Sequence, residues 1–350
     1  MVMPLSQMRT YQWSRDTAGV QASSRTGVKR HCLEICMREQ EPPTAVGEHH
    51  TVNFIVPIDF SKPALAALRW AEELAARGPG RLIAVHAIEP TPLGESSELV
   101  AMLEARGLER LHGACARAVS SGIEVVRECR IGEPSMVIED VAQRTPNPFI
   151  VMGNRGLGAL RRVLLGSVAD RVLRHAACPV LVVRENDEPP ARPRILVATD
   201  FAHDAEAAVA AARVVALRSR EQPRVALLHV VLPPQVIEAV ESPVIPRDQL
   251  GAEEDDAREQ LEPIAAEFRR LGAETTAEIA RGDVFRAVTE RADLLHADMV
   301  ALGRHGVSIL ERLLLGSTAE RVLHRARCAV LTARAAPVAT EKRVRAAIIT

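Results

Sequence analysis

A glycine and serine motif that could hold phosphate occurs twice in the chain, 150 residues apart. Gly153-Asn-Arg-Gly156 is followed by nine residues and then by Gly166-Ser167, and Gly303-Arg-His-Gly306 is followed by nine residues and then by Gly316-Ser317. Glycine lets the backbone approach a ligand closely, and a helix that begins here would offer free amides to an anion. Arginines beside these loops would reinforce the attraction for phosphate, namely Arg155, Arg161, Arg162, Arg304 and Arg312.

A simpler interpretation of the two serines is that each one only caps a helix. Ser167-Val-Ala-Asp170 and Ser317-Thr-Ala-Glu320 both place an acid three residues after the serine, which resembles a capping box. Recurrence of the whole spacing favours phosphate binding, and the capping interpretation stays open beside it. The motif is neither a P-loop, which needs Gly-Lys-Ser/Thr, nor the dinucleotide fingerprint, which follows the first strand.

The repeat also predicts the domain organisation. Residues 153–181 and 303–331 agree at 16 of 29 positions, and such self-similarity indicates repeated units. We predict two copies of one domain, at residues 51–185 and 192–335, joined by a short linker rich in proline and charge. Residues 1–48 are predicted to be a disordered leader and 336–350 a tail.

Apolar runs alternate with helical patterns in both copies. Strands are expected at 52–58, 81–88, 123–130, 149–152 and 178–183, with helices at 62–77, 95–120, 134–144 and 167–175. The second copy repeats this order, with strands at 194–199, 225–232, 275–281, 299–302 and 328–333 and helices at 205–220, 249–271, 284–295 and 317–325. The alternation predicts an α/β fold with two tandem, doubly wound, five-stranded parallel sheets of the Rossmann-like, adenine-nucleotide-binding type. Each glycine loop follows a fourth strand, so it starts at the edge where such sheets bind ligands.

Composition limits the classes of function. The formal net charge of −1 argues against a nucleic-acid partner, and no apolar run is long enough for a membrane span or a signal peptide. We therefore expect a soluble, cytoplasmic protein. The six cysteines form no disulfide framework, and Cys178 and Cys328 are expected to be small core residues. We expect no metal site in the protein itself, and buried structural roles for His86 and His229.

The spacing Gly-x2-Gly-x9-Gly-Ser after the fourth strand resembles the signature of ATP-binding universal stress proteins. The likeness includes Val56-Pro57-Ile58-Asp59-Phe60-Ser61 and Gly132-Glu133-Pro134 in the first copy, and Val197-Ala-Thr-Asp200-Phe201 in the second. It spans about 51–185 and 192–335. The second copy departs from the first where Val284 replaces Pro134 and Ala202 replaces Ser61, which leaves the quality of each pocket open.

The resemblance implies a set of nucleotide-binding residues. Asp59, with Pro57, and Asp200 would lie beside the nucleoside, although a turn or N-cap role for either aspartate is the alternative. Ala87 and Val230 would offer backbone to the adenine, and Gly132 and Gly282 would line the ribose. The phosphates would be held by Gly153, Gly156, Gly166, Ser167 and Val168 in the first copy and by Gly303, Gly306, Gly316, Ser317 and Thr318 in the second.

The function implied is that of an ATP-binding stress-response protein, a nucleotide-dependent sensor or adaptor without dedicated catalysis. Its cofactor would be ATP, with Mg²⁺ held mainly by the phosphates. A slow ATPase or nucleotidyl- or phosphoryl-transfer enzyme is the first alternative, and a structural adaptor with empty pockets is the second. The fifth strands are apolar to their ends, and an exposed edge of that kind tends to pair with another strand. The resemblance implies that this pairing joins the two domains in an internal pseudo-dimer, with further self-association and a protein partner left open.

Overall fold

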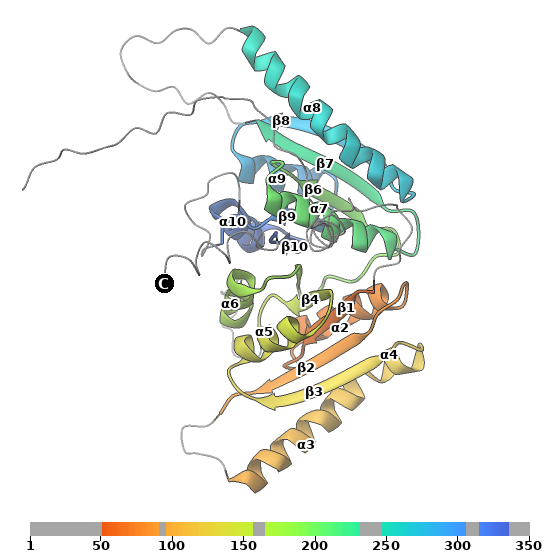
Figure 1. Cartoon of the computed structure of the whole chain (residues 1–350), viewed down its shortest axis with the longest axis vertical. Coiled ribbons are helices and arrows are strands. Elements are labelled where there is room, and N and C mark those ends of the chain that lie inside the picture. The colour runs from red at the N-terminus through yellow and green to blue at the C-terminus, as the bar shows by residue number, and fades with distance from the viewer. Residues whose placement is uncertain (1–50, 91–95, 157–164, 232–246, 306–314, 336–350) are drawn as a thin grey trace, which may run out of the picture. The chain divides into compact units, whose positions relative to one another are not determined.

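The computed structural model describes residues 51–90, 96–156, 165–231, 247–305 and 315–335, without the side chains of 247–252. The predicted leader 1–48 and tail 336–350 lie outside these residues. Ten strands form one sheet in the order β3-β2-β1-β4-β5-β10-β9-β6-β7-β8 (Figure 1). Their bounds are β1 Asn53–Pro57, β2 Leu82–Ile88, β3 Val125–Ile131, β4 Pro148–Gly153, β5 Val180–Val183, β6 Arg194–Ala198, β7 Arg224–Val231, β8 Glu274–Arg281, β9 Met299–Gly303 and β10 Ala329–Ala333.

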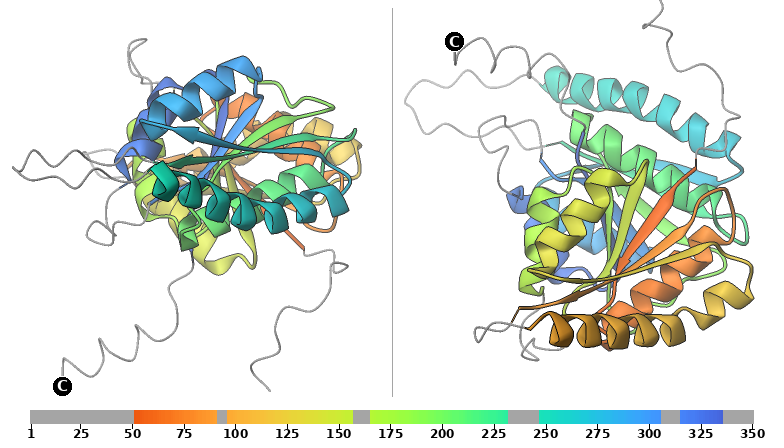
Figure 2. Two further views of the ribbon diagram at one scale, coloured as in Figure 1. Left: turned by 90° about the horizontal axis from the view of Figure 1, so that it is seen from above. Right: turned by 60° about the horizontal axis from the view of Figure 1, so that its bottom comes forward.

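Helices cover both faces of this sheet (Figure 2). They are α2 Lys62–Ala75, α3 Ser97–Ala114, α4 Ala116–Ser120, α5 Pro134–Arg144, α6 Ser167–His175, α7 His203–Leu217, α8 Arg247–Arg270, α9 Val284–Leu294 and α10 Ser317–Arg325. Buried residues of α2, α3, α7 and α8 belong to one hydrophobic cluster, and those of α5, α6, α9 and α10 belong to a second. Each cluster contains residues of both repeats, so the two domains share their cores.

The predicted fold class is confirmed, and the main difference in the helices is a break in one of them, beside shifts of up to three residues at the ends of others. The helix expected at 95–120 is divided at Cys115, whose φ of −89° and ψ of 4° end α3 and begin α4. Cys115 is fully buried at this bend. The sequence on either side favours a helix, so the local sequence does not predict the break.

The predicted pairing of the fifth strands is also confirmed. β5 and β10 are antiparallel, with Val182 opposite Val330 and Val180 opposite Thr332, whereas the other strand pairs are parallel. Their order on either side of this pair is the same in reverse. The two repeats are therefore related by an approximate two-fold axis at the β5–β10 seam, as expected for an internal pseudo-dimer.

Polar contacts add to this seam. Arg218, which follows α7, is buried and donates to the carbonyl oxygens of Leu74 at 3.1 Å and Pro79 at 2.7 Å in the first domain. The linker is fixed to α2, where Trp70 Nε1 donates to the carbonyl of Asp187 at 3.0 Å. The domains are thus joined by hydrogen bonds as well as by their cores.

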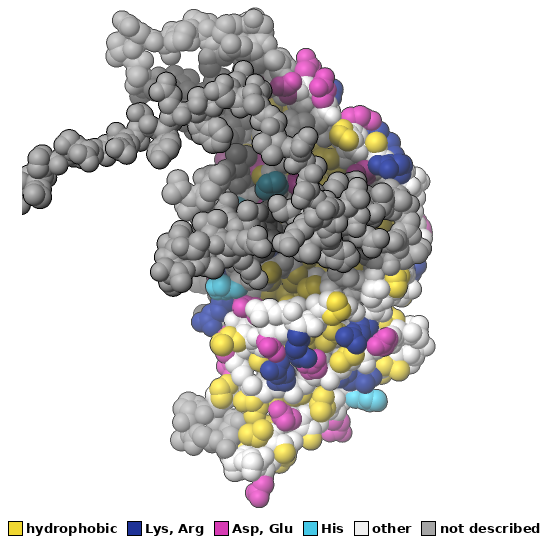
Figure 3. Space-filling view, viewed as in Figure 1, with side chains coloured by type: hydrophobic (Ala, Val, Ile, Leu, Met, Phe, Trp, Pro, Cys, Tyr) yellow, Lys and Arg dark blue, Asp and Glu magenta, His cyan; other side chains and the backbone are white. Residues whose placement is uncertain are grey.

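The surface carries both signs of charge. Lys and Arg side chains lie among Asp and Glu side chains on the visible face of the first domain (Figure 3). Ion pairs of that domain include Arg130 with Asp140 and Arg144 with Glu128. This mixture agrees with the small formal net charge. Among the described residues, no helix combines the length and apolar character that a membrane span requires.

Candidate functional site

A cavity of about 650 Å³ opens at the carboxyl ends of β1, β2 and β4 in the first domain. Every residue predicted for the first site except Gly132 lines it, namely Pro57, Asp59, Ala87, Gly153, Gly156, Gly166, Ser167 and Val168. Gly132 lies just after β3 with a φ of +157°, outside the lining. The structure therefore brings together residues that are up to 111 positions apart in the sequence.

Asp59 is held just beyond the carboxyl end of β1 by a sharp turn. Phe60, the next residue, has a φ of +68°, which reverses the chain before α2. Asp59 Oδ1 accepts a hydrogen bond from Ser61 N at 2.9 Å, and Ser61 in turn caps α2 by accepting from Ala64 N at 3.3 Å. The turn role considered for Asp59 is thus real, and it leaves Oδ2 directed at the glycine loop.

The glycines of the loop permit close approach between chain segments as well as to a ligand. A Cβ atom at Gly156 would lie 2.5 Å from Asp59 Oδ2, and one at Gly153 would lie 2.8 Å from the carbonyl carbon of Pro63. At Gly166 it would lie 3.1 Å from the Cα of Arg155. Gly153 is therefore required for β4 to pack against α2, whereas Gly156 faces the cavity beside a carboxylate.

The capping-box interpretation of Ser167 is wrong. Gly166 is the N-cap residue of α6, with extended backbone, and no side chain caps this helix; Ser167 is its first helical residue and is exposed. Asp170 is engaged by Arg174 instead, at 3.0 and 3.1 Å. The reason is that Gly166 N donates to the carbonyl of Asn154 at 2.8 Å, which sets the start of the helix one residue earlier. The first amides of α6, which lack intrahelical partners, lie in the lining of the cavity.

Charged side chains of both signs line the cavity. Arg155 lies 3.7 Å from Glu185, and Lys62 lies 3.0 Å from the same carboxylate. The hydrogen bond from Lys62 and the nearby Arg155 hold the pKa of Glu185 below its ordinary value. Asp59 and Glu89 add two carboxylates to the lining. Glu89 was missed from the sequence, although its place directly after the second strand could have indicated it.

Apolar residues complete the wall of the cavity and were also missed. They come from β1, β2 and β4 and from α2, α5 and α6, or from residues next to these elements, and are Ile58, Ala64, Val85, Pro134, Ile138, Met152 and Ala169. Periodicity assigns such residues to a core but does not show which of them border a cavity. The lining of the pocket therefore combines apolar side chains with glycines, helix amides and charged groups.

The second domain repeats much of this local geometry. Phe201 has a φ of +62°, and Asp200 Oδ1 accepts from Ala202 N at 3.1 Å. Gly316 is the N-cap residue of α10 and donates to the carbonyl of Arg304 at 2.9 Å, so Ser317 is again the first helical residue and not the cap. Of the remaining predicted residues, Val230, Gly282, Gly303 and Thr318 have equivalent places, and Gly306 lies outside the described residues.

Two residues make the second glycine loop different. Asp204 accepts from His305 N at 3.1 Å and from Ala335 N at 2.8 Å, and its Oδ2 lies 2.7 Å from His305 Nδ1. Arg304, which was predicted to attract phosphate, is buried and directed into the first domain. That prediction is wrong for Arg304, because its side chain binds carbonyl groups across the seam.

The strand histidines are half-buried rather than buried as expected, and Cys178 and Cys328, at equivalent positions of the two repeats, are free thiols. Nδ1 of His86 lies 2.7 Å from the carbonyl oxygen of Ile58, and Nδ1 of His229 lies 2.9 Å from that of Thr199. Burial raises the pKa of the Cys178 thiol to about 11 and that of Cys328 to about 12. Among the described residues, no group of His, Cys, Asp and Glu has the arrangement of a metal site.

Comparison with known proteins places the chain in a family. The universal stress protein family matches residues 52–184 and, separately, residues 192–334. The chain belongs to the universal stress protein family. The resemblance read from the glycine motif is therefore confirmed, with both repeats matched.

Individual relatives agree with this assignment. A universal stress protein of Mycolicibacterium smegmatis is 26% identical over 291 residues, covering 80% of this chain and 96% of the relative. One of Thermus aquaticus is 40% identical over 131 residues, covering 36% of this chain and 91% of the relative. The crystal structure of a universal stress protein from Archaeoglobus fulgidus has a TM-score of 0.63 at 23% identity, covering 81% of this chain and 98% of that one, and supports the fold.

Proposed function

We propose that this universal stress protein binds ATP in the cavity of its first domain, and that binding rather than catalysis is its biochemical role, as a nucleotide-dependent sensor or adaptor. One observation carries the proposal: the residues predicted for the first site, all except Gly132, line one cavity of about 650 Å³. That volume is within the range of pockets for small ligands, roughly 300–1,000 Å³.

The lining suits the parts of a nucleotide. Ala87 at the end of β2 and the apolar wall around Ile138 would receive the base, since a backbone edge beside apolar surface suits a flat heterocycle. Gly166, Ser167 and Val168 at the start of α6 would receive the phosphates, because the helix macrodipole and the free amides both favour an anion. Arg155 would exchange its pairing with Glu185 for a phosphate, while Mg²⁺ would be held mainly by the phosphates.

The second domain is proposed to offer a weaker site. Asp200, Val230, Gly282, Gly303, Gly316, Ser317 and Thr318 keep their equivalent places, but Asp204 fastens the start of the second loop to α7 and Arg304 points away from it. The composition of the chain leads us to propose a cytoplasmic location as well.

The test is titration calorimetry of the full chain with Mg-ATP, NAD and FMN, on the wild type and on Ser167→Glu. A carboxylate at the first position of α6 should leave the free energy of unfolding unchanged or raise it by about 0.3–1 kcal/mol, because it complements the helix dipole. The same carboxylate should repel a phosphate and abolish ATP binding. The matched control is Ser317→Glu, which makes the same change at the start of α10 and should leave the stronger site intact.

Three outcomes would overturn the proposal. They are NAD or FMN binding tighter than ATP, ATP affinity in Ser167→Glu equal to that of the wild type, or steady phosphate release from ATP by the pure protein. The last result would favour the enzymatic alternative.

A further inference from the structure

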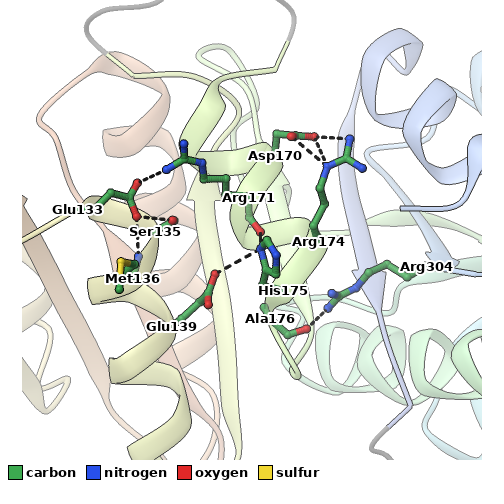
Figure 4. A network of polar contacts seen from close by, with 10 residues as sticks. All are labelled: Glu133, Ser135, Met136, Glu139, Asp170, Arg171, Arg174, His175, Ala176 and Arg304. Atoms are coloured by element: carbon green, nitrogen blue, oxygen red, sulfur yellow. Dashed lines mark hydrogen bonds and ion pairs between the residues drawn. The ribbon is translucent and has the colours of Figure 1, made fainter. Parts of the chain in front are cut away.

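Arg304 reaches from the second glycine loop into the first domain. It directly follows β9, only 1% of its surface is exposed, and its Nη2 donates to the carbonyl oxygens of Ala176 and of Cys178, the latter at 3.3 Å. Ala176 is the C-cap residue of α6, and Figure 4 shows the guanidinium of Arg304 at this end of the helix. A cation there is favourable, because the last carbonyls of a helix lack intrahelical partners and carry the negative end of the dipole.

The opposite end of α6 is part of the proposed nucleotide site. Its N-cap Gly166 and its first residues Ser167 and Val168 line the cavity. The helix has nine residues, so its ends are only about 13 Å apart at 1.5 Å per residue. A short helix moves as a unit, and a change of position at Ala176 is therefore also a change at Ser167.

Other contacts hold α6 along its side, but they do not attach its C-terminal end to the glycine loop of the second domain. Arg171 lies 3.0 Å from Glu133 at the start of α5, and His175 lies 3.8 Å from Glu139 (Figure 4). Arg174 reaches Glu320 of α10 at 3.5 Å, but that pair is partly exposed and contributes little.

The second domain receives a matching contact from a different residue. Arg184, which follows β5, donates to the carbonyl of Cys328 at 3.0 Å and to that of Leu323 at 3.3 Å, at the end of α10. By the offset of the repeat, the counterpart of Arg304 is Asn154, and the counterpart of Arg184 is Arg334. Each helix that begins at a glycine loop is thus held at its far end by an arginine from the other domain, but only Arg304 belongs to a glycine loop itself.

The buried position of Arg304 is energetically unfavourable. Its Nε and Nη1 are buried and find no hydrogen-bond partner among the described residues. Burial lowers its pKa to about 10. A buried charge that is incompletely paired is destabilising compared with an apolar residue of similar size, so its position calls for a role other than general stability.

We infer that Arg304 is a positioning residue of the first-domain site: supplied by the second domain, it holds the C-terminal end of α6 so that Gly166, Ser167 and Val168 meet the phosphates of the nucleotide. The inference rests on the proposed function. It links the second glycine loop to the first pocket through one side chain, and the loop is itself fixed to α7 by the contacts of Asp204 with His305.

The experiment compares Arg304→Met with Arg184→Met in the full chain carrying Ser317→Glu, so that only the first pocket is titrated. Mg-ATP affinity is measured by calorimetry, and the exchange of amide hydrogens in α6 and α10 is measured without nucleotide. We expect Arg304→Met to weaken ATP binding about tenfold, a typical size for coupling between sites, and to speed exchange in α6. Arg184→Met should speed exchange in α10 and leave ATP affinity within about twofold of the parent, since it touches the other helix. Arg304→Lys keeps a charged donor and should restore most of the affinity.

Equal weakening of ATP binding in the two methionine variants would overturn the inference, because it would mean that any loosening of the seam has the same effect. Unchanged exchange in α6 of Arg304→Met would overturn it as well. Should that variant not fold, Arg304→Gln, which retains one donor, replaces it under the same criteria. Failure of the unmodified protein to bind ATP would instead refute the proposed function, and the exchange in α6 would still decide whether Arg304 holds this helix.

Discussion

Thr332 is a buried hydroxyl whose removal should stabilise the protein. It lies in β10, opposite Val180 of β5 and Leu302 of β9, at the centre of the ten-stranded sheet. The residue is 0% exposed, and its Oγ1 finds no partner in the described part of the chain. The equivalent residue of the first repeat is Val182, so Thr332→Val makes the two seam strands alike at this position.

The magnitude follows from the cost of an unpaired hydroxyl. Burying such a group without a hydrogen bond costs about 1–3 kcal/mol in proteins. Valine keeps the branched shape at Cβ and the preference for strands, so the backbone and packing need not change. We expect Thr332→Val to raise the free energy of unfolding by about 1–2 kcal/mol, after some allowance for imperfect packing of the new methyl.

Urea unfolding followed by circular dichroism is the measurement, and the midpoint should rise at an unchanged m-value. The matched control is Val182→Thr, which inserts a hydroxyl at the equivalent buried position of β5 and should lower the free energy of unfolding by a similar amount. If Thr332→Val proved neutral or destabilising, the idea that the hydroxyl is buried without a hydrogen bond would be wrong. The idea that the two seam strands are equivalent would fail if Val182→Thr were harmless.

Three further predictions follow from the site and the seam. Without nucleotide, Ser167→Ala should change the free energy of unfolding by less than about 0.5 kcal/mol, since Ser167 is not the N-cap residue. The substitution should also reduce the rise in melting temperature on adding Mg-ATP. A large loss of stability without nucleotide would mean that Ser167 caps the helix after all. Arg218→Met should lower the free energy of unfolding by about 2–4 kcal/mol, because two buried carbonyls lose a charged donor. The control Arg220→Met removes an exposed arginine and should change the free energy of unfolding little. Similar losses for the two variants in urea titrations would contradict this prediction. The pKa of Cys178 is raised from 9.0 to about 11 and that of Cys328 from 9.0 to about 12, so stability should be full below pH 9 and fall above it, as only the unfolded thiols ionise. A flat stability curve from pH 8 to 11 would argue against this burial.

The sequence predicted elements whose signals are local. The bounds of α5 and α6 are those expected, because Pro134 can begin a helix and the apolar spacing of α6 is strongly helical. These signals depend on neighbours in the chain. The pairing of β5 with β10 joins distant strands, and it was predicted because the strands are apolar throughout and because the family resemblance implies pairing at this edge.

The errors concern contacts between distant residues. The hydrogen bond from Gly166 N to the carbonyl of Asn154 decides that Gly166, not Ser167, precedes the helix, and glycine and serine are both acceptable N-caps. Arg304 looked like a phosphate ligand because it lies in a glycine loop, yet its partners are 126 and 128 residues away in the other domain. Glu89 and the apolar wall were missed because periodicity does not locate cavities.

The approximate two-fold axis explains why the repeats differ at the seam. An arginine at position 154 would be directed at the carbonyl of Cys328, where Arg184 already donates at 3.0 Å. Two guanidinium groups at one buried helix end would repel each other. Each helix end is held instead by one arginine of the other domain. In a dimer of identical chains both ends would have to receive it from the same sequence position. A tandem chain is free of that constraint, and here one end takes its arginine from a glycine loop and the other from the residue after β5, so that the two domains are not interchangeable.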